Sequence, residues 1–333
     1  MSREQVFTLL SAQSGEFLSG EDISAQLGIS RAAVWKAVDA LRRDGYTIEA
    51  QTGLGYRLTD SPDALTEREL RRYLGGTETI GKTLHCFESI DSTNSFLKRA
   101  AAEGAPDGAV AVADEQTAGR GRRGRSFSSG AGRGVYLSAL LRPRLSPKKV
   151  LPLTALGAVA ACNAVERACG VRPQIKWTND LVLNGKKLSG TLTELSLEGE
   201  SGALDYAVIG IGVNCNNARE DFPPELRDIA TSLCLETGRR VCRAALAAAL
   251  IEELDGLYAA LQDGDTAAYL AAYRRDCLTL GREVQLLWQD AREKVTALDV
   301  DEQFGLVVRH EDGRVETVRT GEVSVHGLYG YVE

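Results

Sequence analysis

The sequence predicts an α+β protein with three parts: a helical N-terminal domain over residues 1–62, a mixed-sheet domain over 63–277 and a small all-β domain over 278–333. Three patterns lead to this prediction. Amphipathic helical spacing dominates the first part, strands alternate with helices and hairpin turns in the second, and only short strands follow Gly281. We expect helices on one face of the central sheet.

The composition is that of an ordinary globular protein, with 333 residues, 44% hydrophobic and 26% charged, enough for two or three domains. A formal net charge of −7 argues against a general nucleic-acid or membrane binder. The sequence shows neither a signal-peptide pattern nor an apolar run that we judge long enough to span a bilayer, so we expect a cytoplasmic protein with no membrane partner. The scattered cysteines lack a C-x-x-C spacing and the histidines lack a metal pattern, which argues against disulfides and a zinc site.

Residues 1–62 follow the order of a winged helix-turn-helix. An apolar stripe from Val6, a short helix ending at Gly28 and a helix over 31–43 precede two alternating runs that predict a hairpin. Such a domain lays its second helix in the DNA major groove, and a dimer on a two-fold operator is implied. Because the domain is not basic overall, a helical module with no DNA target is the alternative. The expected DNA contacts are Ser30, Arg31, Ala32, Trp35 and Lys36.

The central domain opens with helix caps and strands. Thr66 and Glu69 form a capping box for a helix that reaches Leu74, and a strand over 84–89 then runs into Asp91-Ser92-Thr93-Asn94 before a helix over 95–102. Short hydroxyl and amide side chains at this junction can orient a polar ligand. They are also the commonest N-caps, and capping is the better explanation of this tetrapeptide taken alone.

An arginine-glycine loop over residues 116–125 follows the strand at 109–113. Its glycines allow folded-back backbone, and its guanidinium groups match phosphate and carboxylate oxygens. In an acidic chain this loop favours closure over a small anionic ligand, whereas a nucleic-acid-binding tail or a solvated linker is the alternative. The loop carries Gly119, Arg120, Gly121, Arg122, Arg123, Gly124 and Arg125.

The second half of the domain contains a strand end, 176–181, that carries a cation, an aromatic ring, an amide and a carboxylate. Asn184-Gly185 predicts a hairpin turn, and the glycines at 210 and 212 permit close approach of a ligand or another backbone. The remaining expected elements of the domain are strands over 135–141, 191–197 and 206–213 and helices over 152–169, 241–261 and 266–277.

The final part reads as a small β-barrel of SH3-like type. Asp312-Gly313 predicts a tight hairpin within it. The expected strands cover 283–288, 294–300, 305–309 and 314–319, and residues 321–324 close the run.

Five motifs in this order resemble those of the biotin protein ligases. Each is weak alone, but the fixed order is specific, and the likeness spans essentially the whole chain. With the N-terminal helix-turn-helix, the chain resembles the bifunctional bacterial form, which is both a biotin ligase and the repressor of the biotin operon. The motifs are D-S-T-N at 91–94, Q-T-A-G-R-G-R-R-G-R at 116–125, K-W-T-N-D-L at 176–181, K-L-S-G at 187–190 and G-I-G-V-N at 210–214.

The resemblance implies a central domain similar to class II aminoacyl-tRNA synthetases and lipoate ligases. It implies that the domain joins biotin to AMP from ATP with Mg²⁺, and passes the biotinyl group from biotinyl-5′-AMP to a lysine of the biotin carboxyl carrier protein of acetyl-CoA carboxylase. When carrier is scarce, the adenylate-bound protein is expected to form a homodimer and repress biotin synthesis genes, with the adenylate as corepressor. The C-terminal domain would be structural, or would help to dock the carrier or close over ATP.

The resemblance also implies roles for single residues. Lys187 and Arg120 are the expected catalytic cations, because two anions must meet in the adenylation step. Asp180 is the candidate Mg²⁺ ligand, although this ion often binds through phosphates and water. Lys176 is a phosphate contact or simply a surface residue. The expected biotin contacts are Ser92, Thr93, Asn94, Gln116, Gly119, Arg120, Lys187, Gly190, Gly210 and Gly212. The expected ATP and adenylate contacts are Arg120, Gly121, Arg122, Arg125, Phe127, Lys176, Trp177, Asn179, Asp180 and Asn214.

Four positions depart from the usual pattern. Thr178 stands for proline, Ser189 for alanine and Thr191 for a branched aliphatic residue, and none of these changes removes a catalytic group. Phe127 stands where the bifunctional form often has tryptophan, so we expect weaker stacking on adenine.

Three alternatives to a bifunctional ligase and repressor follow from the sequence. One is a ligase whose N-terminal domain does not repress, and another is a sensor that binds biotinyl-AMP without making it. The third is a lipoate or octanoate ligase on the same fold. Lys187 and the arginine loop argue against a sensor, and the polar set Ser92, Thr93 and Gln116 suits a ureido ring better than an acyl chain.

Overall fold

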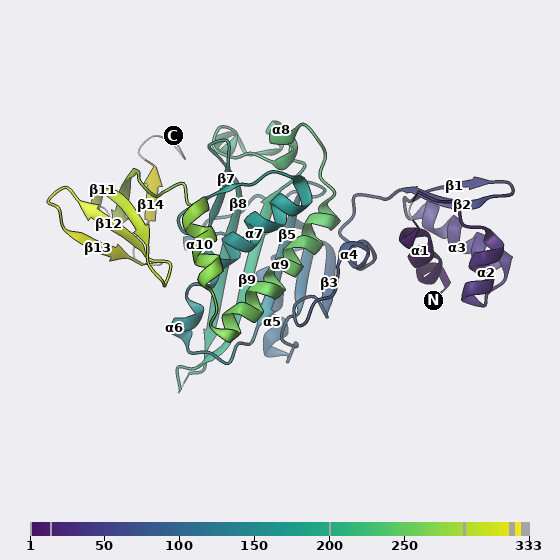
Figure 1. The fold of residues 1–333 in the computed structure, drawn as a ribbon, viewed down its shortest axis with the longest axis horizontal. Helices are drawn as coiled ribbons and strands as arrows, with labels where there is room; N and C mark the ends of the chain where they lie inside the picture. Colours follow the sequence, from purple (N-terminus) through teal and green to yellow (C-terminus); the bar gives the residue numbers. More distant parts are fainter. Residues whose placement is uncertain (1, 14, 200, 289–290, 320–323, 328–333) are drawn as a thin grey trace. The chain divides into compact units, whose positions relative to one another are not determined.

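The computed structural model describes residues 2–13, 15–199, 201–288, 291–319 and 324–327 (Figure 1). The chain divides into two compact units, Met1–Ala64 and Leu65–Glu333. The C-terminal strands therefore belong with the central sheet in one unit. The separate third domain beginning near residue 278 stays a prediction.

The N-terminal unit has the predicted order of three helices and a hairpin. The strands pair antiparallel, and the hydroxyl of Ser30 accepts a hydrogen bond from the backbone N–H of Ala33 at 3.2 Å, which caps the third helix. Apolar residues from all three helices and the hairpin form a separate core. The elements are α1 (Ser2–Ala12), α2 (Gly20–Leu27), α3 (Arg31–Arg43), β1 (Thr47–Gln51) and β2 (Gly55–Asp60).

A seven-stranded mixed sheet forms the centre of the second unit, with the strand order β3-β4-β5-β9-β8-β7-β6. Strands β3 and β4 are parallel, and the other neighbours are antiparallel. Asn184 and Gly185 have φ of 47° and 79°, as the predicted tight turn requires. The strands are β3 (Leu84–Ile90), β4 (Val110–Gln116), β5 (Gly134–Leu141), β6 (Gln174–Lys176), β7 (Asp180–Leu183), β8 (Lys186–Leu197) and β9 (Leu204–Asn214).

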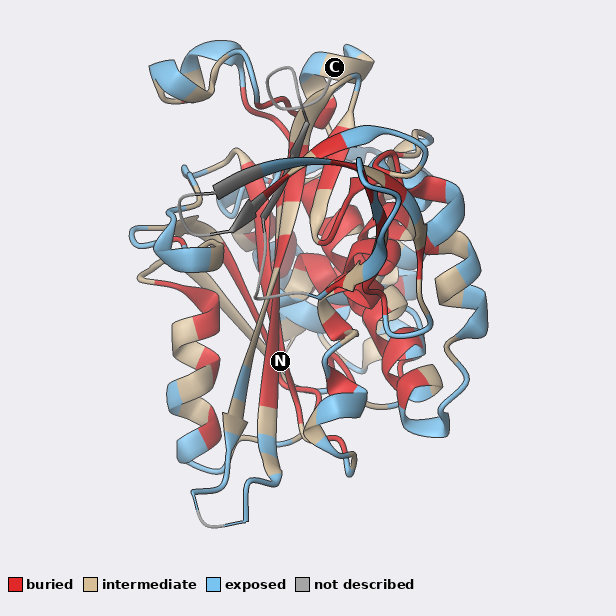
Figure 2. Cartoon of the chain, turned by 90° about the vertical axis from the view of Figure 1, so that its left-hand side faces the viewer, coloured by how far each residue is buried: buried red, intermediate tan, exposed pale blue. Residues whose placement is uncertain are grey.

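Helices cover both faces of this sheet, so the expectation of a single covered face was wrong. Helices α7 (Leu153–Cys169) and α9 (Arg243–Asp263) pack in the main core on one face, and α5 (Thr93–Ala102) packs on the other. Strand β5 gives the reason: all of its residues are buried, so neither side of the strand faces water. Figure 2 shows buried residues, in red, along both strands and helices. The other helical elements are α4 (Glu67–Tyr73), η1 (Arg122–Gly124), α6 (Pro147–Val150), η2 (Arg219–Asp221), η3 (Pro224–Leu226), α8 (Leu233–Thr237) and α10 (Ala267–Asp276).

One stretch corrects the expectation that no apolar run is long enough to span a bilayer. Residues Pro147–Cys169 meet that length and composition, but 67% of the apolar window is buried inside the protein. Most of the stretch is α7, which packs against α9 and the central sheet. A buried core helix can have the same length and apolar content as a membrane-spanning helix, so these two properties alone are weak evidence for a membrane span.

The C-terminal strands form a five-stranded antiparallel sheet with the order β13-β12-β11-β10-β14. Its closure into an SH3-like barrel stays a prediction, and residues 321–323 of the expected closing run lie outside the described residues. The ring of Phe304 contacts Tyr273 of α10 edge to face, at 5.3 Å between centroids. The strands are β10 (Glu283–Trp288), β11 (Ala291–Val300), β12 (Leu306–His310), β13 (Val315–Val318) and β14 (Ser324–Gly327).

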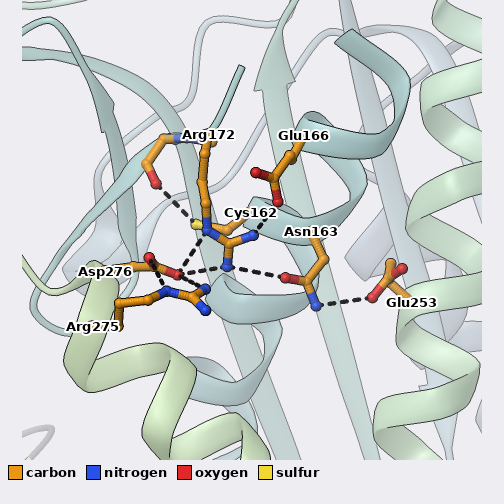
Figure 3. A network of polar contacts seen from close by, with 8 residues as sticks. Cys162, Asn163, Glu166, Arg172, Glu253, Arg275 and Asp276 are labelled. Atoms are coloured by element: carbon orange, nitrogen blue, oxygen red, sulfur yellow. Dashed lines mark hydrogen bonds and ion pairs between the residues drawn. The ribbon is translucent and has the colours of Figure 1, made fainter. Parts of the chain in front are cut away.

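A polar network ties the helices to the chain just before β6 (Figure 3). Arg172 donates to Asp276 at the end of α10 at 2.6 Å, and it also donates to Glu166 and Asn163 of α7. Asn163 in turn donates to Glu253 of α9. The network therefore fixes the start of β6, the strand that ends at Lys176 and is followed by Trp177-Thr178-Asn179.

Candidate active site

The site is built on the sheet face that α5 covers, at the N-terminus of that helix. Ser92 caps α5 by accepting a hydrogen bond from the backbone N–H of Ser95 at 3.5 Å. The same residue also lines the pocket. Thr93 and Asn94 begin the helix and are buried. The pocket is lined by Ser92, Thr93, Asn94, Gln116, Arg120, Phe127, Tyr136, Leu137, Ser138, Gly190, Leu192, Gly210, Ile211 and Gly212.

A continuous run of hydrogen bonds joins the polar side chains of this pocket. We call the residues of this run the pocket floor; they are Ser129, Gln116, Thr93, Ser138 and Asn94. Gln116 accepts from the backbone N–H of Thr93 at 2.9 Å through Oε1 and donates through Nε2 to Ser129 at 3.0 Å. The hydroxyls of Thr93 and Ser138 lie 2.6 Å apart, and Ser138 donates to Oδ1 of Asn94 at 2.6 Å. The predicted polar set is therefore brought together, joined by Ser138 and Ser129, which the sequence reading missed.

Two glycines of β9 make room for side chains. A Cβ on Gly210 would lie 2.1 Å from Oδ1 of Asn94, and a Cβ on Gly212 would lie 2.6 Å from the ring of Phe127. The groups that approach these glycines closely are therefore a side-chain amide and an aromatic ring, whereas the sequence predicted a ligand or another backbone. Phe127 lies in the same pocket as the predicted biotin contacts, edge to face with Tyr136 at 6.3 Å.

The arginine loop folds back on itself. The N–H of Phe127 donates to the carbonyl of Gly119 at 2.9 Å, and the N–H of Gly121 donates to that of Arg125 at 2.7 Å. Arg123 and Gly124 at the tip have φ of 57° and 74°, which a glycine adopts readily. Gly119 also needs to be a glycine, because a Cβ there would lie 2.4 Å from the carbonyl oxygen of Phe127.

Two arginines of this loop reach different parts of the site. Arg120 lies 3.2 Å from Glu194 of β8, and Arg122 donates to Oδ1 of Asn179 at 2.9 Å. Burial lowers the pKa of Arg122, although the carboxylate of Asp180 acts in the opposite direction. Arg123 and Arg125 are exposed. The loop therefore joins the polar pocket to the strand end at 176–181.

Lys187 and Asp180 form an ion pair beside the pocket, with Nζ 2.7 Å from Oδ1. The amide of Asn179 donates to the same carboxylate at 3.1 Å. A Cβ on Gly190, a pocket residue, would lie 3.5 Å from Nζ of Lys187, so the ammonium reaches the pocket wall. Two predicted catalytic cations, Lys187 and Arg120, thus lie at the edge of one pocket.

Lys176 is buried, which excludes the interpretation as an exposed strand-end lysine. Burial lowers its pKa to about 8, and Lys187 and Arg125 add to this, while Asp180 opposes it. The lysine thus sits among the charged groups predicted to bind ATP, in a setting that disfavours its charge. A bound anion would reverse that effect.

Two predicted ATP contacts use their polar groups within the protein. The indole of Trp177 donates to the backbone carbonyl of Phe304 at 2.9 Å, and Nδ2 of Asn214 donates to that of Thr231 at 3.0 Å. The carbonyl of Thr178 accepts from the hydroxyl of Tyr273 at 3.0 Å. The C-terminal sheet and α10 therefore hold the strand end that carries Asn179 and Asp180.

Glu194 is the charged residue that sequence reading missed. It accepts from Nδ2 of Asn94 at 3.0 Å and from Lys98 at 2.9 Å, and it pairs with Arg120. Strand periodicity offered a signal, since Gly190, Leu192 and Glu194 alternate onto one face of β8. That face is the one that lines the pocket.

The N-terminal unit presents its predicted DNA contacts on one exposed side of α3. Arg31, Ala32, Trp35 and Lys36 are all exposed, and Trp35 retains 55% of its accessible surface. The opposite side of the helix buries Val34, Ala37, Val38 and Leu41. The side of α3 that carries Trp35 and the cations is therefore not used for packing within the N-terminal unit.

Comparison with known proteins agrees with both units. Residues 86–214 match the biotin/lipoate A/B protein ligase family, and residues 2–57 match an HTH domain. The bifunctional ligase/repressor BirA of Bacillus subtilis is 44% identical over 242 residues, which cover 73% of this chain and 74% of that protein. The Escherichia coli protein of the same name is 31% identical over 312 residues, covering 93% and 94%.

Solved structures show the same likeness. The biotin protein ligase from Aquifex aeolicus in complex with biotin and ATP superposes with a TM-score of 0.63 at 29% identity, covering 74% of this chain and 99% of that one. The site geometry, the N-terminal helix-turn-helix and these relatives all indicate a biotin protein ligase with an added helix-turn-helix domain. The chain therefore belongs to the bifunctional ligase/repressor family of biotin protein ligases.

Proposed function

We propose that this chain joins biotin to AMP with ATP, and then transfers the biotinyl group to a lysine of a biotin carboxyl carrier protein. The observation that carries the proposal is that a hydrogen-bonding floor and two cations, Arg120 and Lys187, meet at one pocket. A cyclic urea needs donors and acceptors, and a carboxylate needs cations. The relative whose structure contains biotin and ATP supports this reading.

In the first step a carboxylate oxygen of biotin attacks the α-phosphorus of ATP. A bond from that oxygen to phosphorus forms as the bond to pyrophosphate breaks. Two anions must approach one another, so Arg120 and Lys187 would neutralise them, with Asp180 orienting the ammonium. Phosphoryl transfer depends on positioning and charge neutralisation of this kind.

In the second step the amine of a carrier lysine attacks the acyl carbon of biotinyl-5′-AMP. An amide forms, AMP leaves with the bonding electrons, and the amine loses a proton. The arginine loop and Phe127 would close over the anhydride and keep water from it. The folded-back loop, with Phe127 against Gly212, supports this role.

The two ends of the site would bind different groups. Thr93, Asn94 and Gln116 would face the ureido ring, with Ser92 beside them. Arg122 and Asn179 are hydrogen-bonded to each other and would contact phosphate, together with Lys176 and Arg125. Gly119, Gly121, Gly190 and Gly210 would shape the backbone around the ligands, and Trp177 and Asn214 would support the nucleotide side from behind.

Mg²⁺ is proposed to enter with the phosphates of ATP. Within the described part of the chain, no group of three His, Cys, Asp or Glu side chains could hold a metal ion. Asp180 already accepts from Lys187 and Asn179. A single carboxylate suits Mg²⁺, which keeps several water and phosphate ligands, so Asp180 would contribute one ligand or hold a water of the ion.

The direct test of the ligase proposal is the exchange of labelled pyrophosphate into ATP with different acids. We expect exchange with biotin and none with lipoate, octanoate or no acid. Exchange with lipoate or octanoate, and none with biotin, would instead assign the chain to the other acid class that this fold serves. Labelled biotin should then appear on a purified carrier domain, and should not appear when the carrier lysine is replaced by arginine.

We further propose that the N-terminal unit binds operator DNA in the cytoplasm as a homodimer when biotinyl-AMP is bound, and so represses biotin synthesis genes. The exposed side of α3 supports DNA contact by Ser30, Arg31, Ala32, Trp35 and Lys36. Adding biotin and ATP should increase both dimer mass and DNA affinity. Their failure to do so in an active ligase would favour a ligase with a non-repressing N-terminal domain.

A variant pair tests the DNA surface. Lys36→Ala should weaken binding to every duplex selected by the wild type from a random library, and should reduce the salt slope by about one. Lys148→Ala removes an exposed lysine of the second unit and should leave DNA binding unchanged. Equal effects of the two variants would contradict the assignment.

A further inference from the structure

Glu194 has more partners than an ordinary strand-face carboxylate. Its side chain retains only 18% exposure, and it meets Asn94, Lys98 and Arg120. Burial opposes its ionisation, but the hydrogen bonds from Asn94 and Lys98 and the charges of Lys98 and Arg120 together lower the pKa of Glu194. It is therefore an ionised acceptor at the edge of the pocket floor.

An ionised carboxylate can only accept hydrogen bonds, so it fixes how Asn94 is turned. The amide must present its NH₂ group to Glu194, at 3.0 Å, and its oxygen to Ser138. The hydroxyl of Ser138 then donates its single hydrogen to Asn94, at 2.6 Å. Glu194 thus determines the direction of a hydrogen bond that it does not itself make.

The same logic continues to Thr93. Its hydroxyl oxygen lies 2.6 Å from that of Ser138, and a contact this short needs a hydrogen between the two atoms. Because Ser138 has used its hydrogen, the hydrogen must come from Thr93. Oε1 of Gln116 also lies 3.1 Å from the Thr93 hydroxyl and accepts the backbone N–H of Thr93; while the hydroxyl hydrogen points to Ser138, this oxygen keeps a lone pair open. The hydroxyl of Thr93 then offers only lone pairs to a ligand in the pocket.

We propose that Glu194 is a positioning residue for substrate choice: it sets the direction of the hydrogen bonds Asn94–Ser138–Thr93, so that Thr93 presents an acceptor and the pocket selects an acid with an N–H donor. This inference rests on the proposed biotin ligase function, since a ureido ring supplies such N–H groups. Acids without them, such as octanoate, gain nothing from this arrangement. The residue that sets this selectivity, Glu194, therefore lies behind the residues that line the pocket and contacts two of them, Asn94 and Arg120.

Glu194→Gln is the sharpest perturbation, because the shape of the side chain is kept. Lys98 and Arg120 both require an acceptor, so the amide oxygen of Gln would face them and its NH₂ would face Asn94. Asn94 must then turn over, Ser138 must accept from it, and the hydroxyl of Ser138 must donate to Thr93. The direction of the whole chain of hydrogen bonds reverses.

The test measures pyrophosphate exchange with biotin, together with inhibition by octanoate. For Glu194→Gln we expect the KM for biotin to rise about ten-fold or more, because the hydrogen of Thr93 then turns to Oε1 of Gln116 and both oxygens lose an acceptor position for a ligand donor. The KM for ATP and the inhibition constant of octanoate should stay within about two-fold. Lys98→Met removes an ion pair of Glu194 but keeps its contact to Asn94, and should also stay within about two-fold.

A double variant supplies a rescue that a merely structural role would not show. In Glu194→Gln combined with Asn94→Asp, the new carboxylate accepts from both Gln and Ser138, which restores the original direction. We expect it to recover most of the lost affinity for biotin, with thermal unfolding unchanged from the single Gln variant.

Three results would overturn the inference while leaving the ligase function intact: a wild-type KM for biotin in Glu194→Gln, a parallel loss of octanoate affinity, or no recovery in the double variant. A rise in the KM for ATP alone would likewise overturn it, since Glu194 would then act through Arg120. Absence of biotin-dependent exchange in the wild type would instead contradict the ligase proposal itself.

Discussion

Nζ of Lys187 lies 2.7 Å from Oδ1 of Asp180, and both residues come from the paired strands β7 and β8. The pair holds a cation at the wall of the pocket, next to Gly190. Strand pairing fixes the backbone of both residues, so the carboxylate can orient the ammonium before any ligand arrives. Preorganised charge of this kind stabilises a transition state without reorganisation at the moment of reaction.

Replacing Asp180 tests this orientation. Asp180→Asn keeps the size and one acceptor oxygen but removes the charge that holds Lys187. We expect kcat for pyrophosphate exchange to fall about ten-fold, with the KM for biotin little changed. An unchanged or higher kcat would mean that Lys187 is positioned by other groups. Asp228→Asn, on an exposed ion pair with Arg219, is the matched control.

The buried Lys176 predicts a pH dependence of ATP binding. Its pKa of about 8 means that the free protein loses this charge as pH rises through that value, whereas bound phosphate needs the charge. The KM for ATP should therefore rise several-fold from about pH 7 to about pH 9. Lys176→Arg keeps a charge throughout this range and should flatten the profile. A profile of equal slope in both proteins would contradict a phosphate contact by Lys176.

Gly210 is predicted to tolerate no side chain. Its added Cβ would lie 2.1 Å from Oδ1 of Asn94, so Gly210→Ala must displace this amide from the pocket floor. We expect the KM for biotin to rise about ten-fold or more. Gly199→Ala places its Cβ in open space and serves as the control. Wild-type kinetics in Gly210→Ala would show that the position of Asn94 is unimportant.

The network of Figure 3 predicts a difference in stability. Arg172→Met leaves Asp276 buried with Arg275 as its remaining cation, so the free energy of unfolding should fall by about 2 kcal/mol. Arg219→Met breaks a pair that is exposed on both sides and should cost no more than about 0.5 kcal/mol. Urea unfolding measures both. Equal losses would show that burial of this network contributes nothing.

Local signals explain why much of the fold was predictable. Ser30, Thr66 and Ser92 accept the backbone hydrogen bonds that their cap patterns predicted, and Asn184-Gly185 makes its turn. Such signals depend on residues a few positions apart, which a sequence displays directly. Most of the residues that line the pocket also belong to the motifs found in the sequence.

The remaining features depend on contacts between distant parts of the chain. Glu194 accepts a hydrogen bond from Asn94, which lies 100 positions away in the sequence. Trp177 donates to the carbonyl of Phe304, which lies 127 positions away. The periodicity of apolar residues in the sequence does not predict contacts between residues this far apart. The second helix layer, by contrast, has a local signal in the sequence, because the nearly continuous apolar run of β5 indicates burial on both faces of the sheet.

The most direct test of the proposed chemistry is biotin-dependent exchange of labelled pyrophosphate into ATP by Lys187→Ala, beside the wild type and Lys186→Ala. The proposal predicts wild-type exchange in Lys186→Ala and a loss of at least about a hundred-fold in Lys187→Ala, since the carboxylate and the α-phosphate lose a shared cation. Exchange by Lys187→Ala at the wild-type rate would contradict the central place of the Lys187–Asp180 pair in adenylation.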